Sequence, residues 1–242
     1  MQKKPKLILV GAGPGDPELI SLKALKAIQN ADCILYDALV DQSLLNHATK
    51  ICEIVFVGKQ KGVCQFKQED IHSLIVSKAK ELGTVVRLKG GDPYIFGRGH
   101  EEKNVAEKAG IEVEIIPGIS SFYSAPELQG IPLTRRGINE SFIVTTATTK
   151  DHTLSEDILR AAKMRSTVVI LMGMHKLDEI CNVFKQEGKK DLPVAIIHKG
   201  STKDEKIGLG TIDNISSVVA EKNLKSPSII VVGEVAKLHP NF

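Results

Sequence analysis

Short, mostly apolar runs alternate with amphipathic segments along the first half of the chain. Runs of four or five such residues are typical of strands that are buried on both faces of a parallel sheet. The strands predicted by this pattern are Leu7–Val10, Cys33–Tyr36, Ile54–Val57, Thr84–Leu88 and Val113–Ile116. Because helical segments separate them, the pattern predicts βαβ units and a mainly parallel sheet.

The amphipathic segments have the period of α-helices. Ser21, a residue type preferred at helix N-caps, precedes a segment whose large aliphatic residues lie on one side. Gln68–Leu82 carries an aliphatic stripe at a spacing of three and four residues, and a further helix is expected around Glu101–Ala109. These helices are expected to cover the sheet.

A break near Pro117 and Gly118 separates this half from a second one. The helices expected beyond it are Ser120–Leu128, a segment near Asp157, Leu177–Phe184 and Ile215–Ala220. The strands expected there are Phe142–Thr146, Val168–Leu171, Val194–Ile197 and Ile229–Val232, with Lys206–Thr211 antiparallel because turn-like residues closely precede it. We therefore expect an α/β fold of two α/β domains, residues 1–118 and 119–242, with a cleft between them.

Composition and charge exclude several classes of function. The formal net charge of +3 and the aromatic content of 4%, with no Trp, do not favour nucleic-acid binding. None of the four cysteines forms a Cys-x-x-Cys pair and no two histidines share a helical spacing, so we expect no metal site. There is neither a run long enough to span a membrane nor the apolar region of a secretory signal, so a cytosolic location is expected.

The first glycine-rich loop, Gly11–Pro17, directly follows a predicted buried strand, which is where open α/β sheets bind ligands. It nearly matches the dinucleotide fingerprint, but the third glycine of that pattern falls on Asp16 and Pro14 lies within the turn. We therefore do not expect a dinucleotide-binding Rossmann fold, NAD or FAD. The alternative to a ligand loop is a tight turn that needs only the conformational freedom of glycine.

Two further loops strengthen the interpretation as a ligand site. Arg87–Gly99 also follows a strand, and its Asp92 can accept hydrogen bonds from a ribose or an amino group. The basic residues at 87, 89 and 98 bracket its turn, and the alternative is a solvated turn with surface charges. In Ile116–Ser121 either serine has the alternative role of a helix N-cap.

Taken together, Val10–Leu19, Arg87–Glu102 and Pro117–Ser121 resemble the tetrapyrrole methylases. Tyr36–Val40 and Gly130–Thr134 extend the resemblance over essentially the whole chain. It implies a cofactor cleft that holds S-adenosyl-L-methionine, with S-adenosyl-L-homocysteine as the product, and a homodimer. The implied activity is C-methylation of a small-molecule tetrapyrrole, uroporphyrinogen III, at carbons 2 and 7 to give precorrin-2, in sirohaem or cobalamin biosynthesis.

The resemblance also implies roles for individual residues. Asp37 is the implied general base and Lys59 the implied proton donor. The implied cofactor contacts are Pro14, Gly90, Gly91, Asp92, Ile95, Ser120, Ser121, Met172 and Gly200. Met172 has the alternative role of a core residue. The candidates to hold the substrate carboxylates are Lys59, Lys61, Arg98, Arg135 and Arg136, for each of which ordinary surface charge is the alternative.

The sequence departs from the family pattern at three places. They are His100, Thr145–Thr148 in place of the usual Thr-Gly-His, and Cys64–Gln68. These departures concern the fit of the substrate more than that of the cofactor. A methylase of a later corrin intermediate such as precorrin-4, a non-catalytic tetrapyrrole-binding protein and a dehydrogenase are the competing interpretations.

Overall fold

The computed structural model describes residues 3–58, 66–149, 151 and 153–242. The chain forms two compact units, Met1–Ser120 and Ser121–Phe242. The division falls after residue 120, whereas the sequence pattern places it after residue 118. Each unit has its own sheet and its own core.

The N-terminal unit contains a five-stranded sheet in the order β3-β2-β4-β1-β5. Its strands are β1 (Lys6–Gly11), β2 (Cys33–Tyr36), β3 (Glu53–Phe56), β4 (Thr84–Lys89) and β5 (Glu112–Ile116). All four neighbouring pairs are parallel. The predicted parallel sheet is therefore confirmed, and each predicted strand overlaps an observed one.

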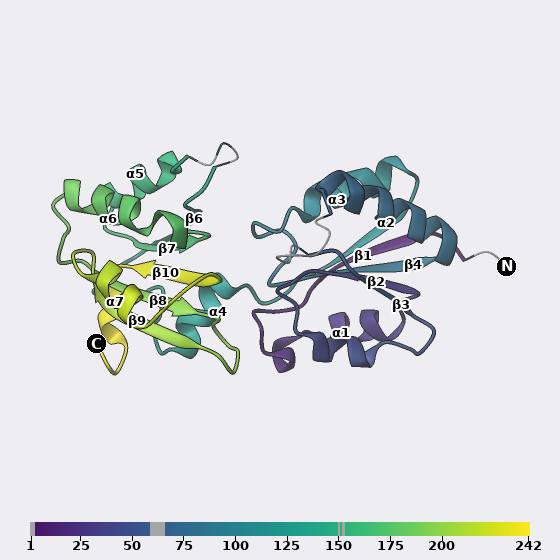
Figure 1. The fold of residues 1–242 in the computed structure, drawn as a ribbon, viewed down its shortest axis with the longest axis horizontal. Coiled ribbons are helices and arrows are strands. Elements are labelled where there is room, and N and C mark those ends of the chain that lie inside the picture. The colour runs from purple at the N-terminus through teal and green to yellow at the C-terminus, as the bar shows by residue number, and fades with distance from the viewer. Residues whose placement is uncertain (1–2, 59–65, 150, 152) are drawn as a thin grey trace. The chain divides into compact units, whose positions relative to one another are not determined.

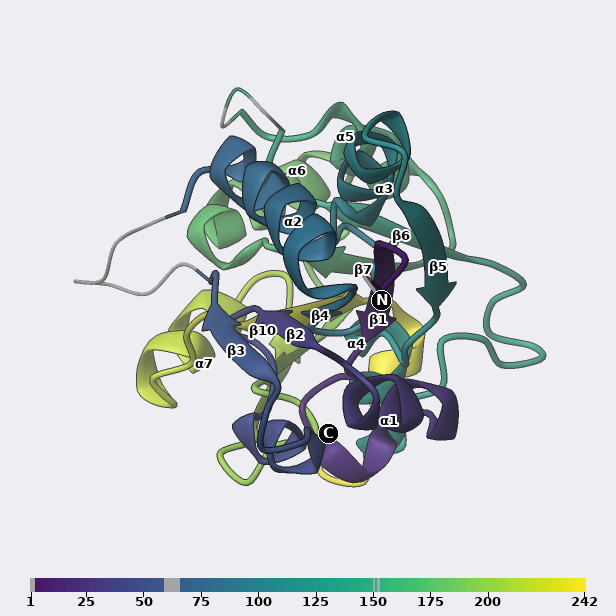
Figure 2. The same ribbon diagram turned by 90° about the vertical axis from the view of Figure 1, so that its right-hand side faces the viewer.

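Helices cover both faces of this sheet (Figures 1 and 2). They are α1 (Leu22–Gln29), α2 (Gln68–Leu82) and α3 (Gly99–Lys108), with short 3-10 helices at Pro17–Leu19 and Gln42–His47. Ile8 and Val10 pack in the core on the α1 side, while Leu7 and Leu9 pack in the core beneath α2 and α3. This strict alternation follows from the two-residue period of a strand. Because both faces are buried, nearly every residue of β1 is apolar.

The C-terminal unit has a mixed five-stranded sheet in the order β6-β7-β10-β8-β9. Its strands are β6 (Phe142–Thr146), β7 (Thr167–Leu171), β8 (Pro193–His198), β9 (Lys206–Thr211) and β10 (Ser228–Val232). The predicted antiparallel strand is confirmed, since β9 pairs antiparallel with β8. β10 also runs antiparallel to both β7 and β8, an orientation that the sequence pattern did not predict.

Helices also cover both faces of the second sheet. They are α4 (Ser121–Leu128), α5 (Glu156–Lys163), α6 (Leu177–Gln186) and α7 (Ile215–Glu221), with 3-10 helices at Met174–Lys176 and Glu234–Leu238. The apolar sides of α5, α6 and α7 share one core cluster with one face of the sheet. Ala125 of α4 and Val235 near the C-terminus pack on the other face.

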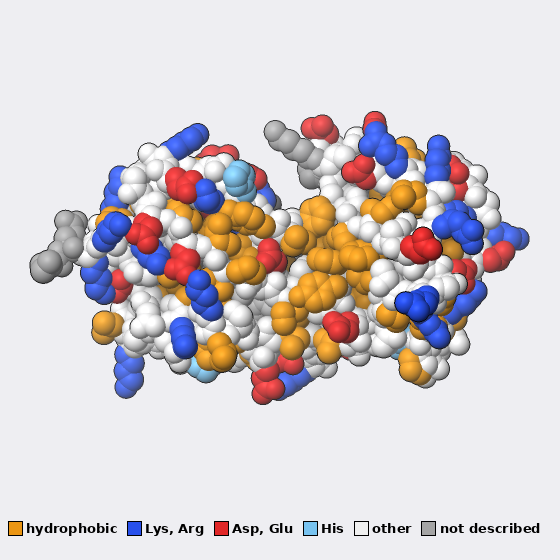
Figure 3. Space-filling model, turned by 180° about the vertical axis from the view of Figure 1, so that it is seen from behind, with side chains coloured by type: hydrophobic (Ala, Val, Ile, Leu, Met, Phe, Trp, Pro, Cys, Tyr) orange, Lys and Arg blue, Asp and Glu red, His pale blue; other side chains and the backbone are white. Residues whose placement is uncertain are grey.

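Exposed charged residues of both signs occur in each unit. Figure 3 shows Lys and Arg scattered among Asp and Glu on the face that it presents, in keeping with the net charge of +3. Among the described residues, no helix has both the length and the apolar character needed to cross a membrane.

Candidate active site

The loops with the motifs leave one edge of the N-terminal sheet. Because its strands are all parallel, their carboxyl ends meet at the same edge, where open α/β sheets bind ligands. Asp37 directly follows β2, Gly90 follows β4 and Pro117 follows β5, while the loop from Ala12 follows β1. The fold therefore collects in one place three motifs that are far apart in the sequence.

Glycines let three of these loops pack backbone to backbone. Gly91 donates a hydrogen bond to the carbonyl of Gly13 at 2.7 Å, and Gly13 donates one in return at 3.3 Å. A Cβ atom added to Gly11 would lie 2.5 Å from the Cα of Gly118, and one added to Gly118 would lie 2.6 Å from the Cα of Gly11. Real Cβ atoms do not approach other atoms so closely. The glycines are thus required by loop-to-loop packing.

Asp92 joins the loop after β4 to the loop after β5 by accepting backbone hydrogen bonds. Its Oδ1 accepts a hydrogen bond from the backbone N–H of Tyr94 at 2.8 Å, and its Oδ2 accepts one from the N–H of Gly118 at 3.0 Å. An ionised carboxylate has about four acceptor positions. Asp92 therefore shapes the edge of the sheet and keeps acceptor capacity for a ligand.

The rest of the second loop presents apolar side chains and one paired arginine to solvent. Tyr94, Ile95 and Phe96 are exposed, although all three are large and apolar. Arg98 forms two hydrogen bonds with Glu101, of 2.8 and 2.7 Å, and this contact raises its pKa. Arg98 is therefore partnered within its own loop. His100, one of the departures from the family pattern, packs its ring edge-on to Tyr94.

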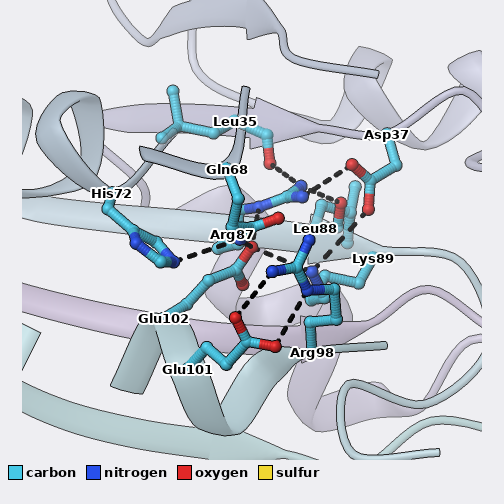
Figure 4. A network of polar contacts seen from close by, with 10 residues as sticks. All are labelled: Leu35, Asp37, Gln68, His72, Arg87, Leu88, Lys89, Arg98, Glu101 and Glu102. Carbon is cyan, nitrogen blue, oxygen red and sulfur yellow. Dashed lines mark hydrogen bonds and ion pairs between the residues drawn. The ribbon is translucent and has the colours of Figure 1, made fainter. Parts of the chain in front are cut away.

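Four charged side chains form a cluster beneath the edge, which we call the buried charge cluster: Asp37, Arg87, Lys89 and Glu102 (Figure 4). Arg87 donates to Oδ1 of Asp37 at 2.6 Å and to Oε1 of Glu102 at 3.1 Å. Lys89 donates to the same Oε1 at 3.0 Å and lies 3.9 Å from Oδ2 of Asp37. The side chains of Arg87, Lys89 and Glu102 are 2%, 5% and 0% exposed, against 28% for Asp37. Asp37 is thus the one member that solvent reaches appreciably.

The environment acts differently on the two cations. Burial on its own lowers the pKa of Arg87, but the carboxylates of Glu102 and Asp37 outweigh it, and the net shift is upward. Burial lowers the pKa of Lys89, the neighbouring Arg87 lowers it further, and Glu102 and Asp37 offset this only in part. The carboxylates of Glu102 and Asp37 therefore favour the charged form of both cations, and they outweigh the effect of burial on the pKa of Arg87 but not on that of Lys89.

Sequence reasoning missed most of this cluster. The sequence pattern identifies Arg87 and Lys89 only as basic residues that bracket a turn, and it assigns no role to Glu102. Two signals were available. Arg87 and Lys89 alternate within the strand Thr84–Lys89, in which five of six residues are buried. Glu102 precedes Ala106 by four residues, on the buried side of α3. Charged residues on buried faces indicate partners inside the protein.

The predicted cofactor contacts in the N-terminal unit lie along the same edge. Pro14 lies half-buried in the first loop, and Gly90 packs against Leu39, since a Cβ added to it would lie 2.7 Å from the Cβ of Leu39. A Cβ added to Gly91 would meet only the Cα of Ser120, at 3.9 Å, so space is open beside this backbone. Ser120 is itself buried. The predicted proton donor Lys59 and the candidate Lys61 lie outside the described residues.

The other predicted contacts belong to the C-terminal unit. Ser121 is the first residue of α4. Met172 and Gly200 follow β7 and β8, two strands that point the same way because β10 runs antiparallel to both, so they lie at the same edge of the second sheet. Met172 is 53% exposed with a φ of 54°, so the alternative of a plain core residue is wrong.

A strained loop surrounds Gly200. Lys199 and Ser201 on either side have φ values of 48° and 67°, which are uncommon outside glycine and concentrate at functional sites. Glu205 holds the loop by accepting from the N–H of Ser201 at 2.6 Å, and Gln129 donates to Glu205. Arg135 and Arg136 lie exposed in the segment between α4 and β6. Among the described residues there is no group of three or more His, Cys, Asp or Glu that could hold a metal ion.

Comparison with known proteins gives consistent matches over the chain. A model of the tetrapyrrole (corrin/porphyrin) methylases matches residues 6–216. A uroporphyrinogen-III C-methyltransferase of Methanocaldococcus jannaschii is 46% identical over 235 residues, which make up 96% of this chain and 97% of that protein.

Solved structures agree with these matches. A uroporphyrin-III C-methyl transferase from Thermus thermophilus, complexed with S-adenosyl homocysteine, superposes with a TM-score of 0.83 at 34% identity, covering 96% of this chain and 99% of that chain. A cobalt precorrin-4 methyltransferase superposes with a TM-score of 0.86 at 27% identity, covering 96% and 95%.

Proposed function

Because the chain belongs to the tetrapyrrole (corrin/porphyrin) methylases, we propose that it methylates uroporphyrinogen III at carbons 2 and 7, giving precorrin-2 for sirohaem or cobalamin biosynthesis. The observation that carries this proposal is the 46% identity, over almost the full length of both chains, to a uroporphyrinogen-III C-methyltransferase. The two-sheet fold and the motif loops along one edge fit the same activity.

S-adenosyl-L-methionine is the methyl donor, and residues at the carboxyl edge of the N-terminal sheet fit it. The open space beside Gly91 lets a ligand approach the backbone, and Asp92 keeps acceptor positions. The residues proposed to hold the cofactor are Pro14, Gly90, Gly91, Asp92, Ile95, Ser120, Ser121, Met172 and Gly200. Bound there, the sulfonium group supplies an activated methyl, so the protein has no electrophile to create.

The work left to the protein is alignment and proton removal. Holding the ring carbon behind the methyl group in a dry site can supply roughly 7–11 kcal/mol of the barrier. Transfer of the methyl group as a cation adds a positive charge to the macrocycle, so the macrocycle must release a proton, which calls for a general base. We assign this role to Asp37, whose carboxylate is held by Arg87 at 2.6 Å and is still 28% exposed.

Basic residues are proposed to complete the site. Lys59 is the proposed proton donor, as the family resemblance implies. Arg98, Arg135 and Arg136 are exposed and suited to bidentate pairing with the carboxylates of the substrate. For Arg98 this requires exchange of its partner Glu101 for the substrate. We also propose that the chain forms a homodimer, which sedimentation equilibrium tests by its mass.

The deciding experiment is incubation of the purified protein with S-adenosyl-L-methionine and anaerobically prepared uroporphyrinogen III, followed by mass spectrometry. The expected product carries two added methyl groups. Calorimetry with S-adenosyl-L-homocysteine runs beside it. Cofactor binding without any gain of mass in the tetrapyrrole would contradict the substrate and leave the methyltransferase class standing, whereas no binding at millimolar ligand would contradict both.

A second candidate is methylation of a later corrin intermediate. It is favoured by the superposition on a cobalt precorrin-4 methyltransferase, but the identity there is 27% against 46% for the first candidate. Offering both substrates in separate reactions distinguishes the two, because only the accepted macrocycle gains mass.

A further inference from the structure

We propose that Glu102 and Lys89 are positioning residues for Asp37, an inference that rests on the proposed methyltransferase function. In this arrangement Glu102 touches no substrate. It holds the two cations Arg87 and Lys89, and these in turn hold the Asp37 carboxylate at the edge of the sheet (Figure 4).

The hydrogen bonds of Glu102 come from two members of the buried charge cluster and from Gln68 of α2. Its Oε1 accepts from Arg87 at 3.1 Å, from Lys89 at 3.0 Å and from Gln68 at 3.3 Å. Its Oε2 is buried and has no hydrogen-bond partner among the described residues. A carboxylate placed only to stabilise the fold would satisfy both oxygens, because an unpaired buried acceptor costs free energy. Oε1 instead accepts all three hydrogen bonds, from donors on β4 and on α2.

The topology explains how Glu102 reaches Asp37. Arg87 and Lys89 are two residues apart in β4, so both side chains lie on the same face of the sheet as α3, which carries Glu102. β2 pairs directly with β4, and Asp37 follows β2. The two cations therefore bridge the helix carboxylate on one side and the carboxylate at the edge on the other.

Burial and charge argue for a role beyond stability. Arg87, Lys89 and Glu102 are at most 5% exposed, and burying such charges gains little net stability compared with apolar packing. The formal charges of the two cations balance those of the two carboxylates, and Arg87 contacts both carboxylates directly. The pKa of Lys89 is already lowered by burial and by Arg87, so Glu102 helps to keep it charged beside Asp37.

The test is a double-mutant cycle in which Glu102→Gln is placed in the wild-type chain and in Asp37→Asn. In the wild-type chain we expect Glu102→Gln to lower kcat about tenfold or more, with the dissociation constant for S-adenosyl-L-homocysteine changed less than about twofold. In the Asp37→Asn chain the same substitution is expected to change kcat less than about twofold, because residues that act as one unit are not additive.

Three further variants extend the test. Glu107→Gln makes the same chemical change on an exposed position of α3 and is the matched control, with kcat expected to be unaltered. Lys89→Met removes the charge at similar length, and Lys89→Arg restores it, so Arg is expected to recover most of the kcat that Met loses. Should Glu102→Gln unfold, which thermal denaturation reports, Lys89→Met takes its place in the cycle.

The outcomes separate this inference from the proposed function. Equal loss of kcat by Glu102→Gln in both backgrounds, or no loss in the wild-type chain, would overturn the positioning role while the methyltransferase stands. A wild-type chain that binds S-adenosyl-L-homocysteine but methylates no tetrapyrrole would overturn the proposed function itself.

Discussion

The carboxylate of Asp92 and the backbone N–H of Gly118 lie 3.0 Å apart, although 26 residues separate them in the chain. The contact joins the loop after β4 to the loop after β5. Asp92 also accepts from the N–H of Tyr94, so one side chain sets the shape of its own loop and the position of the next. Asp92, which the sequence predicts only as a ligand contact, therefore also holds the loops at this edge of the N-terminal sheet in place.

Replacing Asp92 should weaken binding of the cofactor. Asp92→Ala removes both backbone contacts, and with a charge-assisted hydrogen bond worth about 1.5–3 kcal/mol we expect the dissociation constant for S-adenosyl-L-homocysteine to rise about ten- to hundredfold. For Asp92→Asn, which keeps one acceptor oxygen, the dissociation constant should lie between those of the wild-type chain and Asp92→Ala. Calorimetry measures both, with Glu107→Ala as a control, and unchanged affinity in Asp92→Ala would argue against the role.

Replacing Asp37 should separate binding from turnover. Asp37→Asn keeps the size of the side chain and removes the base, so we expect kcat to fall about a hundredfold or more while affinity for S-adenosyl-L-homocysteine is unaltered. Steady-state methylation assays and calorimetry on the same preparation check this. Loss of cofactor binding with near-normal turnover would reverse the assignment of Asp37 and Asp92.

A methyl group on Gly118 should destabilise the fold. Its Cβ would meet the carbonyl oxygen of Gly91 and lie 2.6 Å from the Cα of Gly11. We expect Gly118→Ala to lower the free energy of unfolding by about 2–3 kcal/mol or more, as overpacking does. Gly110→Ala is the comparison, because it adds a methyl group in open space at a φ of 75° and should cost about 1 kcal/mol. Denaturant unfolding measures both, and equal losses would contradict the packing argument.

Asp32 should make the free energy of unfolding depend on pH in acidic solution. Burial alone raises its pKa, but hydrogen bonds from Lys3 and from the N–H of Thr84 outweigh this, and the pKa lies below its ordinary value of 3.8. A carboxyl with a lowered pKa in the folded state contributes stability that is present above 3.8 and is lost as pH falls through the folded value. Asp32→Asn should therefore lower the free energy of unfolding near neutral pH and cost progressively less at about pH 3 and below. A difference that does not narrow in acid would contradict the assignment.

The buried thiols should be unreactive in the folded chain. Burial raises the pKa of Cys33 to about 12 and that of Cys181 to about 11. Since the thiolate is the nucleophile, fewer than about one in a hundred of these thiols is ionised at pH 8. Iodoacetamide at that pH should leave both unlabelled until guanidinium unfolds the chain, as peptide mass spectrometry reports. Labelling of Cys33 in the native protein would mean that β2 opens.

The sequence predicted most of the elements but not every direction. The helix expected at Gln68–Leu82 has those bounds, and Ser21 caps α1 as expected, because periodicity and capping are local properties. The antiparallel direction of β10 was not predicted. An apolar run such as Ile229–Val232 carries no information on its direction, which depends on the connections and on the strands that flank it.

For the candidate site, the loops were predictable and their internal partners were not. Gly90, Gly91, Asp92 and Ser120 come together along one edge because they follow parallel strands, which the sequence pattern indicates. Glu102 was missed because its partners Arg87 and Lys89 lie 15 and 13 residues away. Charges on one strand and one helix form a pair only once the sheet has brought the two elements together.

The contact of Gly11 with Gly118 also limits how this protein can change. The obstacle to a larger residue at either position is main chain, which no substitution elsewhere can shorten. A side-chain clash in a core can be relieved by a smaller neighbour, but this one cannot. Libraries that vary the macrocycle accepted by the protein should therefore leave these glycines untouched and diversify exposed positions such as Tyr94 and Phe96.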